Sequence, residues 1–166
     1  MKMLYWTEYS GHKVDIIGRK KKVDNTIYTF DIETTSYLIL DGEIITAREY
    51  QKLDDDRQER CIKQSCMYVW QFSINDTVYY GRTWDEFVHF LDALEKNDNS
   101  KKLVFIHNLA FEFQHLWSVI RIKSVMSRKS RKLFRCFLED YNIELRCSLM
   151  LSNLKLEKLP EVYQMN

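Results

Sequence analysis

Proline, glycine and long apolar runs are scarce in this chain, and each scarcity excludes a class of protein. One proline and four glycines among 166 residues argue against flexible linkers and disordered segments. No apolar run approaches the roughly 20 residues that a transmembrane helix requires, and residues 1–13 lack the apolar stretch of a signal peptide. We therefore expect one compact domain in the cytoplasm, without a membrane partner.

Paired cysteines are also missing. Cys61, Cys66, Cys136 and Cys147 include no Cys-x-x-Cys spacing, so the Cys61/Cys66 pair lacks a convincing second pair of zinc ligands. Reduced thiols suit the cytoplasm, where disulfides are rare. We expect free cysteines rather than a disulfide scaffold or a zinc site.

Neither sign of charge is in excess. The net charge is +1, so the total does not indicate nucleic-acid binding. Basic residues nevertheless cluster at 19–22 and between Arg128 and Arg135, and residues 54–56 are acidic. Each run is open to two interpretations. It is either a solvated loop or, for the basic runs, a phosphate contact, because cations that displace condensed counterions supply much of the sequence-independent affinity for DNA.

Hydrophobic patterning predicts an α/β fold. Runs of β-branched and aromatic residues predict strands at 26–30, 66–74, 77–81, 103–106 and 143–147. Helical spacing predicts helices over 84–96, from about 110 to 120, and from 153 to 159. We interpret 1–25 as an arm or edge extension, 41–64 as an insertion with a short helix, and 121–138 as extended but irregular. This order predicts a mixed sheet flanked by helices.

Two carboxylates stand at the end of the first predicted strand. Asp31 and Glu33 are two residues apart, so an extended chain places them on one face. Like charges on a core strand repel and lose solvation. Divalent cations such as Mg²⁺ or Mn²⁺, which take oxygen ligands, would relieve that cost. The alternative is a polar strand end that simply faces solvent.

A second polar pair follows the strand at 103–106. Asn108 and Glu112 are four residues apart and lie on one side of a helical turn. Glu112 is either an ordinary partner of the helix dipole or a third carboxylate that meets Asp31 and Glu33 at one edge of the sheet. His107 is either a catalytic base or a packed histidine at the strand end, and we favour the packed histidine.

These residues carry a resemblance to a known family. FDIETT at 30–35 resembles the first exonuclease motif of family B DNA polymerases, and FIHNLAFEF at 105–113 resembles the second motif in its protein-primed form. The resemblance covers about residues 26–160 and implies an RNase H-like sheet. It implies that Asp31 and Glu33 bind metal, that Asn108 contacts DNA and that Phe111 contacts the 3′ end. Glu112 stands where the family usually has Asp, and it would be the next metal-binding and catalytic carboxylate.

A weaker match follows at Cys147-Ser148-Leu149, which resembles an Asp-Ser-Leu stretch of the family with Cys147 in place of Asp. It implies that Ser148 and Leu149 bind single-stranded DNA. The third motif of the family, Tyr-x-x-x-Asp on a later helix, has no counterpart at a matching place. We therefore expect an exonuclease-like domain over 26–166 that is incomplete and truncated before its last helices.

The resemblance implies a function and two ways of fulfilling it. One is the N-terminal part of a proofreading 3′→5′ exonuclease domain, which binds single-stranded DNA 3′ ends and hydrolyses phosphodiesters with two Mg²⁺ or Mn²⁺ ions. Its partner would be the rest of a polymerase chain, and activity alone would be weak. The alternative is a catalytically impaired protein of phage type in the cytoplasm of a bacterial host, which binds DNA or protein or acts as an inhibitor.

Overall fold

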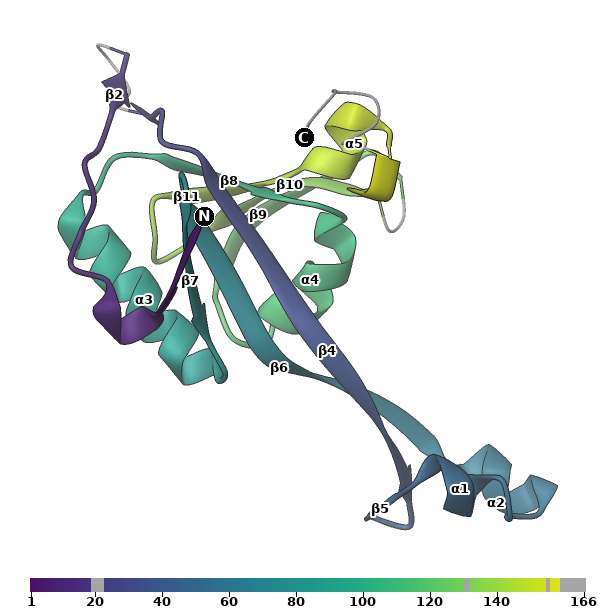
Figure 1. The fold of residues 1–166 in the computed structure, drawn as a ribbon. Coiled ribbons are helices and arrows are strands. Elements are labelled where there is room, and N and C mark those ends of the chain that lie inside the picture. The colour runs from purple at the N-terminus through teal and green to yellow at the C-terminus, as the bar shows by residue number, and fades with distance from the viewer. Residues whose placement is uncertain (19–22, 130–131, 155, 159–166) are drawn as a thin grey trace.

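The computed structural model describes residues 1–18, 23–129, 132–154 and 156–158, and these form a mixed β-sheet with helices packed on it (Figure 1). The main sheet has the strand order β1-β7-β6-β4-β8-β11-β10-β9, with β5 paired to β4. Strands β4, β8 and β11 are parallel, whereas β6 runs antiparallel to both β4 and β7. The expected α/β class with a mixed sheet is confirmed.

The strands are β1 (Lys2–Tyr5), β2 (Ile16–Ile17), β3 (Val23–Asp24), β4 (Tyr28–Leu40), β5 (Glu43–Ile45), β6 (Ile62–Ile74), β7 (Thr77–Gly81), β8 (Lys102–Ile106), β9 (Ile122–Ser127), β10 (Leu133–Leu138) and β11 (Ile143–Cys147). The helices are η1 (Trp6–Glu8), α1 (Ala47–Tyr50), α2 (Asp55–Arg60), α3 (Trp84–Asn97), α4 (Leu109–Leu116), α5 (Ser148–Ser152) and η2 (Leu156–Lys158).

Alternation along β4 separates a buried face of the sheet from an open one. Tyr28, Phe30 and Ile32 are buried, whereas the intervening Thr29 and Asp31 are exposed. The register carries this alternation across the sheet, because buried residues of β4 pair with buried residues of β6 and β8. The period of two therefore assigns the core to one face.

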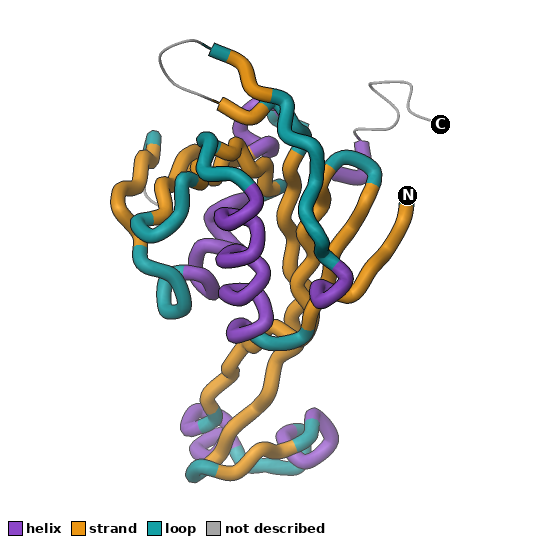
Figure 2. The backbone as a smooth tube through the Cα atoms, turned by 90° about the vertical axis from the view of Figure 1, so that its left-hand side faces the viewer, coloured by secondary structure: helices purple, strands orange, loops and turns teal. Residues whose placement is uncertain are grey.

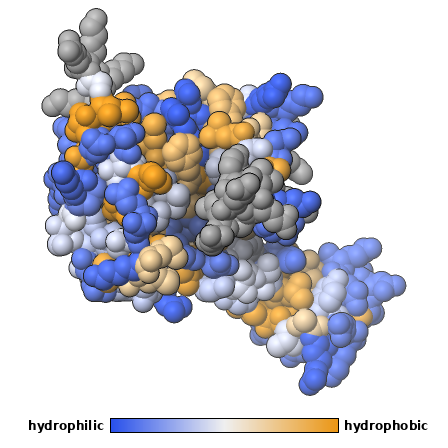
Figure 3. Space-filling model, turned by 45° about the horizontal axis from the view of Figure 1, so that its top comes forward, coloured by the Kyte–Doolittle hydropathy of each residue, from blue (hydrophilic) through white to orange (hydrophobic). Residues whose placement is uncertain are grey.

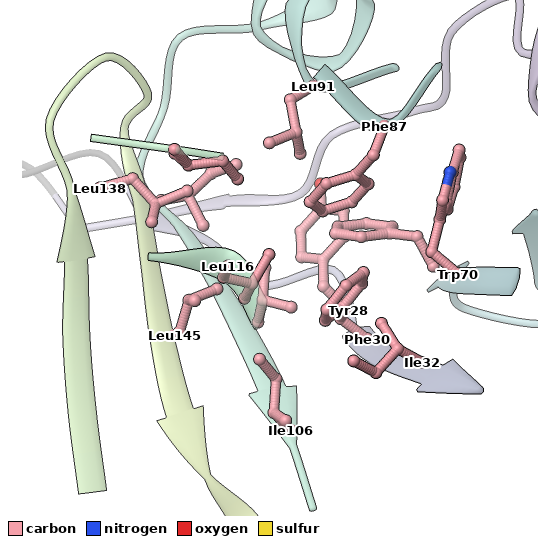
Figure 4. Close-up of a cluster of buried hydrophobic side chains, with 14 of the residues drawn as sticks. Tyr28, Phe30, Ile32, Trp70, Phe87, Leu91, Ile106, Leu116, Leu138 and Leu145 are labelled. Atoms are coloured by element: carbon pink, nitrogen blue, oxygen red, sulfur yellow. The ribbon is translucent and has the colours of Figure 1, made fainter. Parts of the chain in front are cut away.

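Helices α3 and α4 both contribute to the core on that buried face. Phe87 of α3 stacks on Phe30 of β4 with ring centroids 4.7 Å apart. Leu116 of α4 joins the same cluster, which also includes Leu138 and Leu145 (Figure 4). Figure 2 shows the longest helix, α3, lying against one side of the strands. Burial of this aromatic and aliphatic surface is the main force that holds the sheet and helices together.

Helix α3 begins where the sequence predicts. The Thr83 hydroxyl accepts a hydrogen bond from the Glu86 amide at 3.2 Å, and the Glu86 carboxylate accepts one from the Thr83 amide at 3.0 Å. This reciprocal pair satisfies amides that the first helical turn leaves free. The predicted helix at 84–96 is confirmed, as are the hairpin strands and the strands at 103–106 and 143–147.

Strands β4 and β6 extend beyond the body as a long two-stranded ribbon that carries β5, α1 and α2 at its tip (Figure 1). Their pairing runs from Tyr28↔Ile74 to Ile39↔Ile62. Figure 3 shows a largely hydrophilic tip on this projection. The insertion with short helical structure predicted for 41–64 is confirmed. The expected end of the first strand near residue 30 is wrong, because β6 continues to supply backbone partners to β4.

Residues 122–127 and 133–138 form the antiparallel strands β9 and β10, whose register shifts between Leu133 and Arg135 and between Phe137 and Leu138, so the described part of the segment is extended and irregular as expected. Two expectations about helices need correction. The second helix ends at Leu116, earlier than predicted. An additional helix, α5, lies over Ser148–Ser152 and ends at Asn153, which adopts a left-handed conformation with φ of 55°. Asn tolerates this conformation better than most residues and so terminates the helix there. Of the helix predicted over 153–159, the described residues show a 3-10 turn, η2, at Leu156–Lys158.

The N-terminal segment forms part of the folded body. Strand β1 pairs in parallel with β7 at the edge of the sheet, which confirms the expected edge extension for residues 2–5. Farther along, the His12 ring lies between the hydroxyls of Tyr9 and Tyr28, at 2.8 and 2.6 Å. Tyr28 also donates to the buried Asp24 carboxylate. This hydrogen-bonded chain fastens the segment to β4. Across the described residues, no helix has the length and apolar character needed to cross a membrane.

Replacing Phe90 should strongly destabilise the fold. Its ring has no exposed area and lies 5.2 to 5.5 Å from the rings of Phe72, Tyr9, Trp70 and Tyr79. We expect Phe90→Ala to lower the free energy of unfolding by about 3–5 kcal/mol, measured by urea denaturation. Ile44→Ala at the tip of the ribbon, where the residue is 68% exposed, is the control. A loss below about 1 kcal/mol for Phe90→Ala would contradict this packing account.

Candidate metal centre

Asp31 and Glu33 lie within β4 at the point where it parts from β8. The last β4–β8 pair is Thr29↔Phe105; beyond it β4 pairs with β6 and, from Leu38 onward, also with β5. Both acidic residues lie on the open face of the strand, opposite Phe30. Their expected position at a strand end is therefore corrected to a position inside a longer strand. The separation of β4 from β8 still opens the sheet beside them.

Helix α4 brings Glu112 to the same place. Strand β8 ends at Ile106, and Asn108 turns the chain with φ of 66° and ψ of 52° at the start of the helix. The Asn108 carbonyl accepts a hydrogen bond from the Phe111 amide at 2.8 Å. This tight turn directs the first turn of α4 back over the end of β8. Glu112 lies there, only 3% exposed.

The carboxyl groups of Asp31 and Glu112 are in contact. Burial first, and then the neighbouring Asp31, raise the pKa of Glu112 from 4.5 to about 8. Glu112 therefore keeps its proton at neutral pH, within hydrogen-bonding reach of the Asp31 carboxylate. Burial of the Asp31 carboxyl beside Glu112 also raises the pKa of Asp31, and the charge of Glu33 adds to that increase. Two carboxylates this close cannot both ionise without a compensating cation.

One oxygen of this pair lacks a partner. Glu112 Oε2 is buried, and no donor among the described residues forms a hydrogen bond with it. An unsatisfied buried oxygen is costly and rare in folded proteins. Carboxylate oxygens are also the ligands that Mg²⁺ and Mn²⁺ take. Asp31 and Glu112 therefore fit a hard divalent cation, with Glu33 near enough to influence Asp31 electrostatically.

The three acids do not form a ready-made ligand set. Within the ranges that the structure describes, no group of three or more His, Cys, Asp or Glu side chains is arranged to hold a metal ion. The structure thus brings Asp31 together with Glu112, and Asp31 near Glu33. Their role as metal ligands stays a prediction.

The other expected site residues differ in how exposed they are. Asn108 is exposed beside the turn, and its side chain caps no helix amide. The Phe111 ring is 38% exposed and meets His115 edge-on at 5.4 Å. Both therefore remain accessible to a ligand. Leu149 is half-buried against the core, so packing already uses part of its side chain.

Ser148 joins the site through a contact that the sequence did not indicate. Its hydroxyl lies 3.3 Å from His107 Nδ1 and 3.4 Å from the Ile106 carbonyl. The parallel register explains this contact. Cys147 at the end of β11 pairs with Ile106 at the end of β8, so the residues that follow these two strands, Ser148 and His107, lie side by side. His107 is partly buried here, in agreement with a packed histidine.

Comparisons with known proteins return no match. No family model, curated protein or solved structure matches this chain. The functional argument consequently depends on the residues and their geometry.

The proton held by the Glu112 carboxyl predicts that the free energy of unfolding depends on pH. The pKa of Glu112 is raised from 4.5 to about 8, so the folded state holds a proton that the unfolded state releases in this window. The stabilisation is complete below about pH 4.5 and is lost as the pH rises toward 8. We expect Glu112→Gln to flatten this decline in thermal and urea denaturation between pH 5 and 8.5. Glu59→Gln, at an exposed site, is the control. If stability declined with pH equally in Glu112→Gln and in the parent protein, Glu112 would not be the group that holds the proton.

Proposed function

We propose that this chain is an RNase H-like, metal-dependent exonuclease domain that acts on single-stranded DNA 3′ ends, similar to the proofreading domain of protein-primed family B polymerases. The observation that carries the proposal is the contact between Asp31 and the buried Glu112. These residues belong to separate motifs, and a buried acid with a strongly raised pKa beside a second acid is typical of functional sites.

The sheet supports this proposal in outline. The antiparallel strands β4, β6 and β7 are followed by α3, β8, α4, the antiparallel strands β9 and β10, and β11, with β8 and β11 parallel to β4. This arrangement is compatible with an RNase H-like sheet. It places Asp31 on the first of these strands beside the helix that follows β8. A mixed α/β sheet alone does not identify a function, so the argument depends on the acids.

Asp31, Glu112 and Glu33 are the residues that would hold divalent cations. When bound, such cations supply a hydroxide at neutral pH and stabilise charge on the phosphate and the leaving 3′ oxygen. The Glu112 carboxyl must give up its proton before it can act as a ligand. Because the pKa of Glu112 is about 8 without a cation, we expect metal affinity to rise with pH.

The residues around the acids fit a frayed strand end. The exposed Phe111 ring offers a stacking surface for a base, and the Asn108 amide offers both a donor and an acceptor. Both stand on the turn and first helical turn that also position Glu112. The absence of a matching Tyr-x-x-x-Asp in the sequence points to weak hydrolysis by this chain alone.

A nuclease assay tests the proposal. With a 5′-labelled single strand, we expect slow, stepwise shortening from the 3′ end that requires Mn²⁺ or Mg²⁺. Asp31→Ala should lower the rate by at least about 100-fold, since loss of even an outer-shell partner of a metal costs about 10–100-fold. Glu59→Ala should retain the rate.

Two outcomes would contradict the nuclease proposal. One is shortening that persists in Asp31→Ala, which would identify a contaminating nuclease. The other is a lack of metal-dependent shortening beyond the Asp31→Ala background at high protein concentration. Strong Mn²⁺ binding in that second case would favour the alternative of an impaired, binding-only module.

A further inference from the structure

A second candidate site lies beside the candidate metal centre, where β9, β10 and β11 meet α5. A cleft of about 570 Å³ lies between the β9–β10 hairpin and α5. Its lining is both cationic and apolar, and its principal side chains are Arg128, Arg135, Arg146, Phe134, Met150 and Leu151. We call this cleft the arginine groove.

A buried carboxylate fixes two of the arginines. Glu144 has no exposed area, and its Oε1 accepts from Arg135 Nε at 2.8 Å and from Arg146 Nε at 2.7 Å. Lys101 pairs with the other oxygen of Glu144. Burial alone would raise the pKa of Glu144, but Arg146 and Lys101 hold it below its ordinary value. The carboxylate therefore stays ionised and orients both guanidinium groups.

The groove retains a positive excess after these ion pairs form. Glu144 carries one negative charge against the three cations Arg135, Arg146 and Lys101. Arg128 adds a further exposed cation at the rim. Because each guanidinium contacts Glu144 through Nε, its terminal amino groups can reach toward a second anion. Guanidinium groups bind phosphate oxygens in this manner.

The apolar part of the groove suits a planar ring. Phe134 is 37% exposed and Leu151 is 71% exposed, beside the half-buried Met150. Exposed aromatic and aliphatic side chains next to arginines offer a base a stacking surface while its phosphate meets the cations. A simple inorganic anion would make no favourable contact with these apolar side chains.

Position links the arginine groove to the candidate metal centre. Arg146 and Glu144 alternate with the buried Leu145, so they lie on the same open face as Asp31 and Glu33. Cys147 lines the groove, and the next residue, Ser148, contacts His107 at the edge of the metal centre. The two sites are therefore neighbours along the carboxyl ends of β8 and β11.

We propose that the arginine groove binds the phosphates and a base of a single DNA strand whose 3′ end reaches Asp31 and Glu112. This inference rests on the proposed function for the direction of the strand. Strand binding itself requires neither metal nor hydrolysis.

Binding of a fluorescent single-stranded oligothymidine to the full chain in EDTA tests the groove. Arg128→Ala should weaken binding and reduce the slope of log affinity against log salt by about 0.7, the value for one phosphate contact on a single strand. Phe134→Ala should weaken binding by about tenfold, in line with the loss of one stacked base, and leave the slope unchanged. Both residues are exposed, so both variants should fold.

Arg48→Ala in α1, at the far tip of the ribbon, is the matched control and should bind like the parent (Figure 1). The proposal would be overturned if Arg128→Ala and Phe134→Ala had the same affinity and salt slope as Arg48→Ala. So would equal competition by polyglutamate, since that result would indicate a general polyanion surface. The binding assay contains EDTA and needs neither metal nor hydrolysis, so failure of the nuclease assay does not decide this test.

Discussion

The contact between the Asp31 and Glu112 carboxyls is the constraint around which this structure is organised. Two acids held this closely, one of them buried, repel each other and lose hydration unless a proton or a cation lies between them. In the absence of a cation, Glu112 retains the proton. Under the proposed function, a divalent ion would take the place of that proton once the pH or the ion concentration displaces it. The site is thus a cost to stability that a bound cation would offset.

The rest of the fold maintains this contact. The aromatic core beneath Phe30 fixes β4 from one side, and the turn at Asn108 fixes α4 at the end of β8. Because the helices pack on one face of the sheet, the open face is free to carry polar and charged groups. Acids occupy this face on β4, and arginines occupy it on β10 and β11. A single strand with its end at the acids and its phosphates at the arginines matches this separation of charge.

Much of the architecture could be predicted from local sequence, and the reasons for success and failure are physical. Helix α3 was predictable because its capping residues and apolar stripe are local signals. The extension of β4 to Leu40 was not, because it depends on pairing with β6 across an insertion. Helix α5, which lies before the helix predicted from residue 153, was not predicted because its few residues carry little periodicity. Its end depends on the conformation of Asn153.

The candidate site was predictable in part for similar reasons. The approach of Glu112 to Asp31 followed from two polar motifs placed after predicted strands. The contact of Ser148 with His107, and the ion pairs of Glu144 with Arg135 and Arg146, depend on the register of β8, β10 and β11. No local pattern encodes that register. The basic cluster could be recognised in the sequence, but its organisation around a buried carboxylate could not.

The most direct test of this account is to locate a bound ion. Crystals of the protein grown at about pH 8 with Mn²⁺ should show anomalous density between Asp31 and Glu112, with oxygen ligands at roughly 2.0–2.2 Å, close to the distances that Mg²⁺ demands. Crystals at saturating Mn²⁺ with no density there, or with the two carboxyls separated beyond the reach of one ion, would contradict it.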